Sequence, residues 1–124
     1  MIMLDTHVAV GLYEGHTRGL GAAARRAIDR DVVTISPAVL LEIEILHEIR
    51  RIREGAKIIA ASLAEDLDIR VASDRFSEVA AESLAWGFTR DPFDRLIVAH
   101  ASFAKAALIT QDTLIRFRYP KAIG

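Results

Sequence analysis

The most constraining feature of this sequence is a short apolar stretch, Ile2-Met3-Leu4, that leads directly into a carboxylate at Asp5. An apolar run of this length, followed by the start of a helical pattern at Thr6, predicts a short strand that is buried on both faces. In an open sheet of parallel strands, ligands bind in the crevice outside the carboxyl ends of the strands. Asp5 is therefore a candidate site residue, although an acid at this position is equally expected to cap the following helix.

The same succession of strand and helix recurs along the chain. Short β-branched or apolar runs predict strands at residues 32–35, 69–72 and 107–110, and a last edge strand at 122–123. The spacing of apolar residues and the capping signals predict helices at residues 6–14, 20–30, 37–52, 57–66, 74–86, 92–107 and 112–117. Such alternation predicts an α/β fold, with a mostly parallel sheet of four or five strands covered by helices on both faces. We expect one domain, 1–124.

Composition narrows the class of protein. The chain has 16 Lys and Arg against 17 Asp and Glu, so contact with nucleic acid has to come from local arginine clusters rather than from overall charge. The absence of cysteine excludes a disulfide framework, a thiolate nucleophile and a Cys-ligated zinc site, and it suits a reducing cytoplasm. No apolar run approaches the roughly 18 residues of a membrane-spanning helix. We therefore expect a cytoplasmic protein that does not bind membranes.

One acid is predicted to lie on the apolar face of a helix. At 100° per residue, Glu42 falls inside the apolar arc of the helix predicted at 37–52, whereas Glu44 and Glu48 fall on the polar side. A carboxylate that faces a core is unfavourable unless it is paired, hydrogen-bonded or bound to a metal. We therefore favour a functional role for Glu42 over a buried salt bridge, and we expect Glu44 and Glu48 to be solvated.

Three further acids are ambiguous from spacing alone. In Asp91-Pro92-Phe93-Asp94, Asp91 fits a helix N-cap and Asp94 fits the third helical position, where negative charge favours the helix dipole. Asp112 follows the strand predicted at 107–110 and likewise fits a cap. In a doubly wound fold, however, these positions share one edge of the sheet with Asp5 and Glu42. Carboxylates gathered there without lysine repel one another unless a hard cation lies among them, and ligands that are all oxygen suit Mg²⁺ or Mn²⁺.

Four motifs, in this order and at these distances, resemble the PIN-domain ribonucleases, and most closely the VapC-like toxins of VapBC-type toxin–antitoxin pairs. The motifs are Leu4-Asp5-Thr6-His7, residues 35–43 (ISPAVLLEI), residues 90–99 (RDPFDRLIVA) and residues 108–112 (LITQD). The resemblance implies a three-layer PIN-like fold and an endoribonuclease. It implies that the catalytic acids holding Mg²⁺ or Mn²⁺ are Asp5, Glu42, Asp94 and Asp112. It favours Asp94 over Asp91 as the metal ligand of that pair.

The resemblance also implies substrate contacts and partners. Thr110 is expected beside the metal site, and Thr6 and Arg95 join it as candidate substrate-binding residues. For Arg95 we prefer an ion pair with a neighbouring acid to a phosphate contact. The implied partners are RNA, a cognate antitoxin and a second copy of the chain, and the implied effect is inhibition of translation and growth.

The alternative to a nuclease is a PIN-like module that is not catalytic and binds a partner or RNA. Hydrophobic residues make up 52% of the chain, which predicts apolar surface left over for a partner. Leu41 and Ile45 extend the apolar arc of their helix beyond one core face, although the helix at 57–66 is equally expected to cover them. His7 adjoins the predicted site, but we favour a structural role for it. His100 is expected to be a hydrogen-bonded core histidine.

Overall fold

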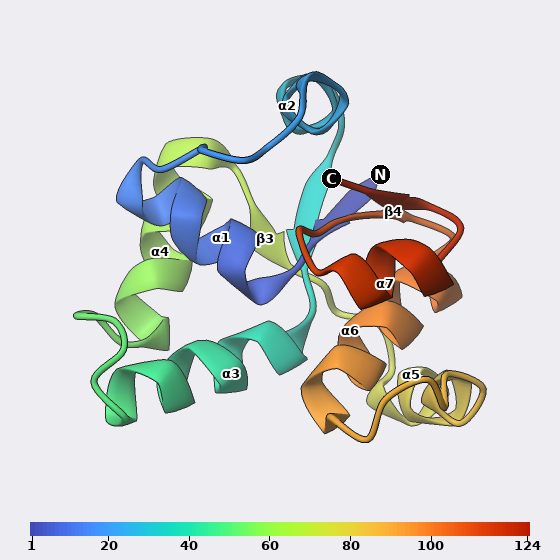
Figure 1. Cartoon of the computed structure of the whole chain (residues 1–124). Helices are drawn as coiled ribbons and strands as arrows, with labels where there is room; N and C mark the ends of the chain where they lie inside the picture. Colours follow the sequence, from blue (N-terminus) through green and yellow to red (C-terminus); the bar gives the residue numbers. More distant parts are fainter.

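A five-stranded sheet forms the centre of the molecule. The computed structural model describes all residues, 1–124, and its strands follow the order β3-β2-β1-β4-β5 with every neighbouring pair parallel (Figure 1). The strands are β1 (Ile2–Leu4), β2 (Val33–Ile35), β3 (Arg70–Val71), β4 (Ala107–Ile109) and β5 (Ala122–Ile123). The predicted α/β fold is confirmed, and the sheet is parallel throughout.

Helices cover both faces of this sheet. They are α1 (Thr6–Glu14), α2 (Ala22–Arg30), α3 (Pro37–Glu48), α4 (Ala56–Leu67), α5 (Phe76–Ser83), α6 (Pro92–Phe103) and α7 (Thr113–Arg118). Helix α1 packs with α3 and α4, and α5 packs with α6, while α3 contacts members of both groups. None of these helices is both long enough and apolar enough to cross a membrane.

The central strand is also the most deeply buried one. Ile2, Met3 and Leu4 are each at most 2% exposed, because β1 has a strand on either side and helices on both faces. Helices α3 and α6 add Val39, Ile43 and other apolar residues to one continuous core. Burying an aliphatic side chain contributes about 1.5–3 kcal/mol, so the tripeptide of β1 is a principal source of stability. The end of β1 is consequently held in a fixed position.

Four helices are shorter than predicted. Helix α2 begins at Ala22 instead of residue 20, after Gly21 as its N-cap. Helix α3 ends at Glu48 instead of residue 52, because Arg50 adopts the left-handed conformation (φ 62°). Helix α6 ends at Phe103, and Lys105 likewise has a positive φ of 55°. Helix α5 runs from Phe76 to Ser83 with Arg75 as its N-cap, so the start predicted at residue 74 and the end predicted at residue 86 are wrong.

Candidate active site

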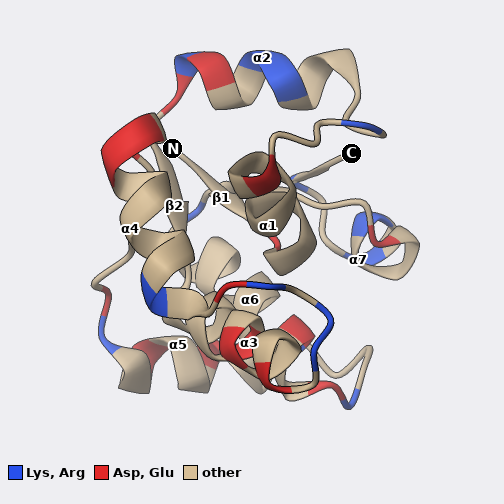
Figure 2. Cartoon of the chain, turned by 90° about the vertical axis from the view of Figure 1, so that its left-hand side faces the viewer, with Lys and Arg blue, Asp and Glu red and all other residues tan.

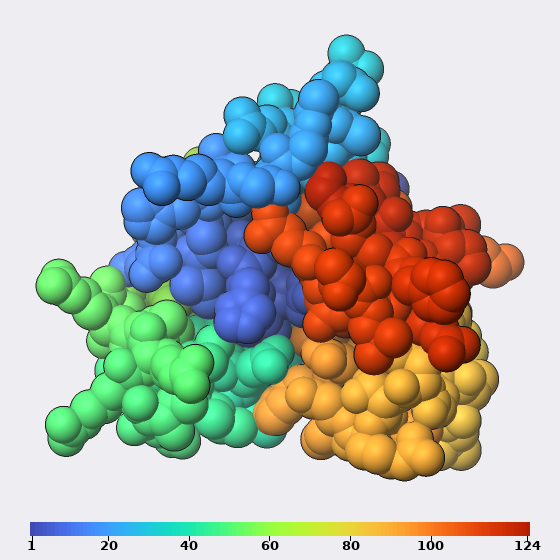
Figure 3. All heavy atoms as spheres, viewed as in Figure 1, coloured from blue at the N-terminus to red at the C-terminus, as the bar shows by residue number.

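A polar pocket opens at the carboxyl edge of the sheet. It has a volume of about 400 Å³, and it contains no apolar, lysine or arginine side chain. Its lining residues are Asp5, His7, Glu42, Asp91, Asp94, Gln111 and Asp112. These residues come from segments that are far apart in the sequence. Figure 3 shows the blue, teal, orange and red parts of the chain meeting on one face of the molecule. The structure therefore brings together all four acids predicted as metal ligands, together with Asp91.

Three of these acids begin helices and still face the pocket. Asp5 follows β1, and its Oδ1 accepts a hydrogen bond from the Thr6 backbone N–H at 2.8 Å. Asp112 caps α7 in the same way through the Ile115 N–H at 2.9 Å. Asp91 caps α6 and accepts hydrogen bonds from two backbone N–H groups with one oxygen. Capping occupies one carboxylate oxygen, so the cap and site interpretations are compatible.

Two buried threonines fix the orientation of the acids. Thr110 donates its hydroxyl to Asp5 Oδ2 at 2.6 Å and accepts the Asp112 N–H at 3.1 Å. The Thr6 hydroxyl donates to Glu42 Oε1. Both threonines are fully buried and lie behind the carboxylates. We predicted them as substrate-binding residues, and the contacts that the structure contains are with the acids.

The carboxylates are close enough to alter one another's ionisation. The pKa of the Asp94 carboxyl rises to about 7, first through burial and then through the charge of the other acids: Asp91, Asp5, Asp112 and Glu42. Burial also raises the pKa of Glu42, and the charges of Asp5 and Asp91 add to this, while the hydrogen bond from Thr6 opposes it. The charge of His7 also opposes the rise for Glu42, but no lysine or arginine lines the pocket to neutralise the negative charge of the acids.

The donor set fits a hydrated divalent cation. No three acidic or histidine side chains converge closely enough to form a complete metal cage by themselves. Mg²⁺, however, usually keeps several waters and binds proteins through only one or two carboxylates. A pocket of about 400 Å³ lined by carboxylate oxygens has room for such an ion with its waters. Uncompensated negative charge at this point gives a cation a favourable place to bind.

Other predicted residues lie elsewhere or have different partners. Arg95 forms no ion pair, and its guanidinium donates to the Ser83 carbonyl at 3.1 Å, so the preferred ion pair with an acid is wrong. His7 is exposed and lines the pocket. Gln111 also lines the pocket and was missed by sequence reasoning. Its position between the end of β4 and the N-cap of α7 could have indicated that it lies at the pocket.

Glu44 and Glu48, the two acids predicted on the polar side of α3, have different environments. Glu48 is exposed, as expected. Glu44 is half-buried, and its Oε1 accepts the Ala56 N–H at 3.0 Å at the start of α4, so the prediction that it is solvated is wrong. The fixed loop between α3 and α4 accounts for this contact. Helix α4 packs on α3, yet Leu41 stays 56% exposed, while Ile45 is half-buried.

The protein is thus an α/β protein with a parallel sheet, and its carboxylate pocket lies beyond the carboxyl ends of the strands. Residues 2–118 match the family model for the PIN domain. The chain belongs to the PIN domain family, which confirms the resemblance inferred from its motifs.

Solved structures with the same fold cover nearly all of the chain. A toxin–antitoxin complex from Klebsiella pneumoniae has a TM-score of 0.69 at 17% identity, covering 100% of this chain and 97% of that chain. VapBC2 from Rickettsia felis, bound to a DNA fragment from the promoter, has a TM-score of 0.64 at 23% identity, covering 99% and 96%. FitAcB from Neisseria gonorrhoeae has a TM-score of 0.55 at 15% identity, covering 99% and 96%. No curated protein matches the sequence.

Proposed function

We propose that this protein is an endoribonuclease that depends on Mg²⁺ or Mn²⁺. PIN domains are generally nucleases, and they generally use divalent metals. The observation that carries the proposal is the gathering of Asp5, Glu42, Asp94 and Asp112 in one pocket that no lysine or arginine lines. Such a pocket repels a phosphodiester by itself, so it suits a nuclease only when a cation is present.

The roles of the chain's own residues follow from their contacts. Asp5 and Glu42 are the two acids whose carboxylates are oriented by buried threonine hydroxyls, so we assign them the most rigid positions in the site. Asp94 and Asp112 approach from the starts of α6 and α7 and complete the binding set. A bound divalent cation would make a water acidic enough to attack phosphorus and would stabilise negative charge on phosphate oxygens. No side-chain nucleophile is needed.

We further propose that this nuclease is the toxin of a toxin–antitoxin pair in the cytoplasm, where it inhibits translation and growth by cutting RNA. The structures described as VapBC2 and as a toxin–antitoxin complex support this proposal through their shared fold. Exposed apolar side chains on α3 and α4, Leu41 and Ile58, offer surface that an antitoxin can cover. A homodimer is part of the same proposal.

The deciding experiment measures cleavage and metal binding together. Purified protein is incubated with total RNA in Mg²⁺, in Mn²⁺ and in EDTA, and calorimetry records Mn²⁺ binding to the wild type and to Glu42→Gln. We expect cleavage only with metal, and binding that the variant loses. Undiminished cleavage in EDTA would refute the metal mechanism. RNA binding without either cleavage or metal binding would identify the alternative, a non-catalytic module.

A further inference from the structure

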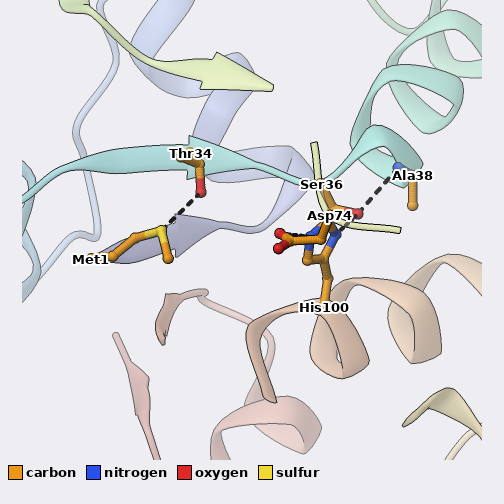
Figure 4. Close-up of polar contacts among 6 residues, drawn as sticks. All are labelled: Met1, Thr34, Ser36, Ala38, Asp74 and His100. Carbon is orange, nitrogen blue, oxygen red and sulfur yellow. Dashed lines mark hydrogen bonds and ion pairs between the residues drawn. The ribbon is translucent and has the colours of Figure 1, made fainter. Parts of the chain in front are cut away.

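Apart from the acidic pocket, one group of polar side chains joins three separate segments, with His100 and Ser36 buried and Asp74 at the surface (Figure 4). His100 of α6 is 1% exposed, and its Nδ1 lies 2.9 Å from the Oγ of Ser36, the N-cap of α3. Its Nε2 lies 2.9 Å from Oδ2 of Asp74, in the connection between β3 and α5. We call these three residues the His100 bridge. The burial of His100 confirms that it is a hydrogen-bonded core histidine.

For a neutral imidazole, one arrangement of hydrogens satisfies every atom of the His100 bridge. A carboxylate only accepts hydrogen bonds, so Asp74 requires the imidazole proton on Nε2. Nδ1 then accepts the hydroxyl hydrogen of Ser36, while the Ser36 oxygen accepts the Ala38 N–H at 3.3 Å. The hydrogen bonds therefore run in one direction from the first turn of α3 into α6. Linked bonds of this kind polarise and strengthen one another.

The His100 bridge lies symmetrically with respect to two acids of the pocket. Ser36 is six residues before Glu42 in α3, and His100 is six residues after Asp94 in α6. Each acid is thus about 9 Å along its helix from the bridge, at 1.5 Å per residue. Helices α3 and α6 pack together, and the Ser36–His100 hydrogen bond is the one side-chain polar contact between them. The bond is the fixed point from which both helices extend to their acids.

We propose that the His100 bridge is a positioning element that sets the separation of Glu42 and Asp94, and thereby the affinity of the pocket for a divalent cation. The inference rests on the proposed function, because it concerns the same acids. Apolar packing between helices is not directional, whereas a hydrogen bond tolerates only a few tenths of an ångström. Misplacement of site residues by about 1 Å is enough to impair a catalytic site.

A pair of substitutions at His100 separates positioning from mere stability. In His100→Gln, the amide nitrogen lies near the place of Nε2 and retains the bond to Asp74, but the link to Ser36 is lost. In His100→Asn, the side-chain oxygen lies near the place of Nδ1 and retains the link to Ser36. A matched control is Ser102→Ala on the same helix, which removes a 2.5 Å hydrogen bond from Ser102 to Glu82 of α5 rather than to α3.

The readouts are the Mn²⁺ dissociation constant by calorimetry, measured well below each melting temperature, and the melting temperature in EDTA. We expect His100→Gln to weaken Mn²⁺ binding by about tenfold or more, as loss of outer-shell support does at metal sites. We expect His100→Asn to bind Mn²⁺ within about threefold of wild type, and Ser102→Ala to bind it like wild type, even where their melting temperatures fall.

The outcomes distinguish this inference from the proposed function. Wild-type-like Mn²⁺ affinity in folded His100→Gln, or equal losses in all three variants, would overturn the positioning role while leaving the nuclease intact. If His100→Gln does not fold, a weakened affinity in Ser36→Ala that Ser36→Thr restores supports the inference, and an unchanged affinity refutes it. Wild-type protein that binds Mn²⁺ but leaves RNA uncut would refute the nuclease alone. Wild-type protein that does not bind Mn²⁺ would refute both.

Discussion

Asp5 uses its two carboxylate oxygens for different purposes. Oδ1 caps α1 locally, and Oδ2 accepts a hydrogen bond from Thr110, which is distant in sequence. A helix cap is worth about 1 kcal/mol and can be provided by serine or asparagine equally well. The placement of a second oxygen in a shared pocket is what an acid adds. The same reasoning applies to Asp112.

The first prediction concerns the acids themselves. Asp5→Asn, Glu42→Gln and Asp94→Asn should each reduce RNA cleavage at least about 100-fold, because each removes a charged oxygen from the proposed metal-binding set. Glu48→Gln should cleave like wild type, because Glu48 is exposed and away from the pocket. Initial cleavage rates of a labelled RNA in Mg²⁺ measure the effect. Comparable losses in Glu48→Gln would show that the assigned pocket is not the active site.

The second prediction follows from the pKa of Asp94, which is raised from 3.8 to about 7. The unfolded chain releases this proton more readily than the folded chain does. The contribution of Asp94 to the unfolding free energy of the metal-free protein is therefore greatest below about pH 4, and it falls as the pH rises to about 7. With allowance for solvent screening of a half-buried group, the loss is about 1–2 kcal/mol. Asp94→Asn should remove this part of the pH dependence.

Thermal melting in EDTA at pH 5 and pH 8 provides the measurement. The two proteins should be similar at pH 5, and the variant should be the more stable at pH 8. A variant that is less stable at both values would mean that Asp94 acts only through the helix dipole, which contributes about 0.3–1 kcal/mol.

The third prediction concerns the hydroxyl of Thr110. Thr110→Val keeps the shape but leaves the buried Asp5 Oδ2 without its donor and the Asp112 N–H without its acceptor. We expect a loss of about 1–3 kcal/mol in unfolding free energy and weaker Mn²⁺ binding. Urea denaturation and calorimetry measure the two effects. Thr34→Val is the control, because the Thr34 hydroxyl has only an exposed contact with Met1, and it should change neither quantity.

At the scale of whole elements, the sequence predicts the presence and order of the strands and helices well. Short apolar runs bounded by polar residues, such as β1 and β4, are unambiguous because every side chain in them is apolar. The ends of α3 and α6 were missed, because Arg50 and Lys105 adopt a left-handed conformation that non-glycine residues seldom take. Local sequence carries little information about such positions.

The site could be predicted only in part. Positions that follow strands, the helical wheel for Glu42 and the family resemblance predicted the four acids, and the structure places all four in one pocket at the edge where parallel strands end. The partners of Arg95 and Glu44 depend on distances between elements, which a helical wheel does not contain. Ser83 lies 12 residues from Arg95, and Ala56 lies 12 residues from Glu44, in different helices.

A fourth prediction belongs to the connection between α3 and α4. Glu44 supplies the cap that Gly55 lacks, because its Oε1 accepts the Ala56 N–H. Glu44→Ala should therefore lower the unfolding free energy by about 1 kcal/mol, whereas Glu44→Gln keeps an acceptor oxygen and should lose less. Cleavage per folded molecule should be unchanged in both. Urea denaturation and cleavage assays test this, and loss of activity in stable Glu44→Gln would place Glu44 in the site.

Charge is distributed unevenly over the whole molecule. Basic residues lie on α2, on α7 and in the loop after α3, where Figure 2 shows blue segments. No lysine or arginine lines the pocket, by contrast. The balanced net charge of −1 thus conceals a local excess of negative charge at one edge of the sheet.

A fifth prediction follows for the stability of the entire chain. A ligand that binds only the folded state adds about 2.7 kcal/mol at 100 times its dissociation constant. Excess Mg²⁺ should therefore raise the melting temperature of the wild type and reverse its order relative to Asp94→Asn at pH 8. Thermal melting with Mg²⁺, and with a matched concentration of NaCl to control for screening, measures this. An equal rise in both proteins would argue against Asp94 as a ligand.

The bond between Thr110 and Asp5 joins residues 105 positions apart, and β4 lies directly beside β1. A ribosome must therefore have synthesised nearly the whole chain before the first strand can receive its neighbour. Until then, Asp5 lacks the Thr110 hydroxyl that orients its carboxylate. The pocket therefore cannot assemble on a growing chain that still lacks β4, and a product truncated before β4 has no Thr110 to orient Asp5.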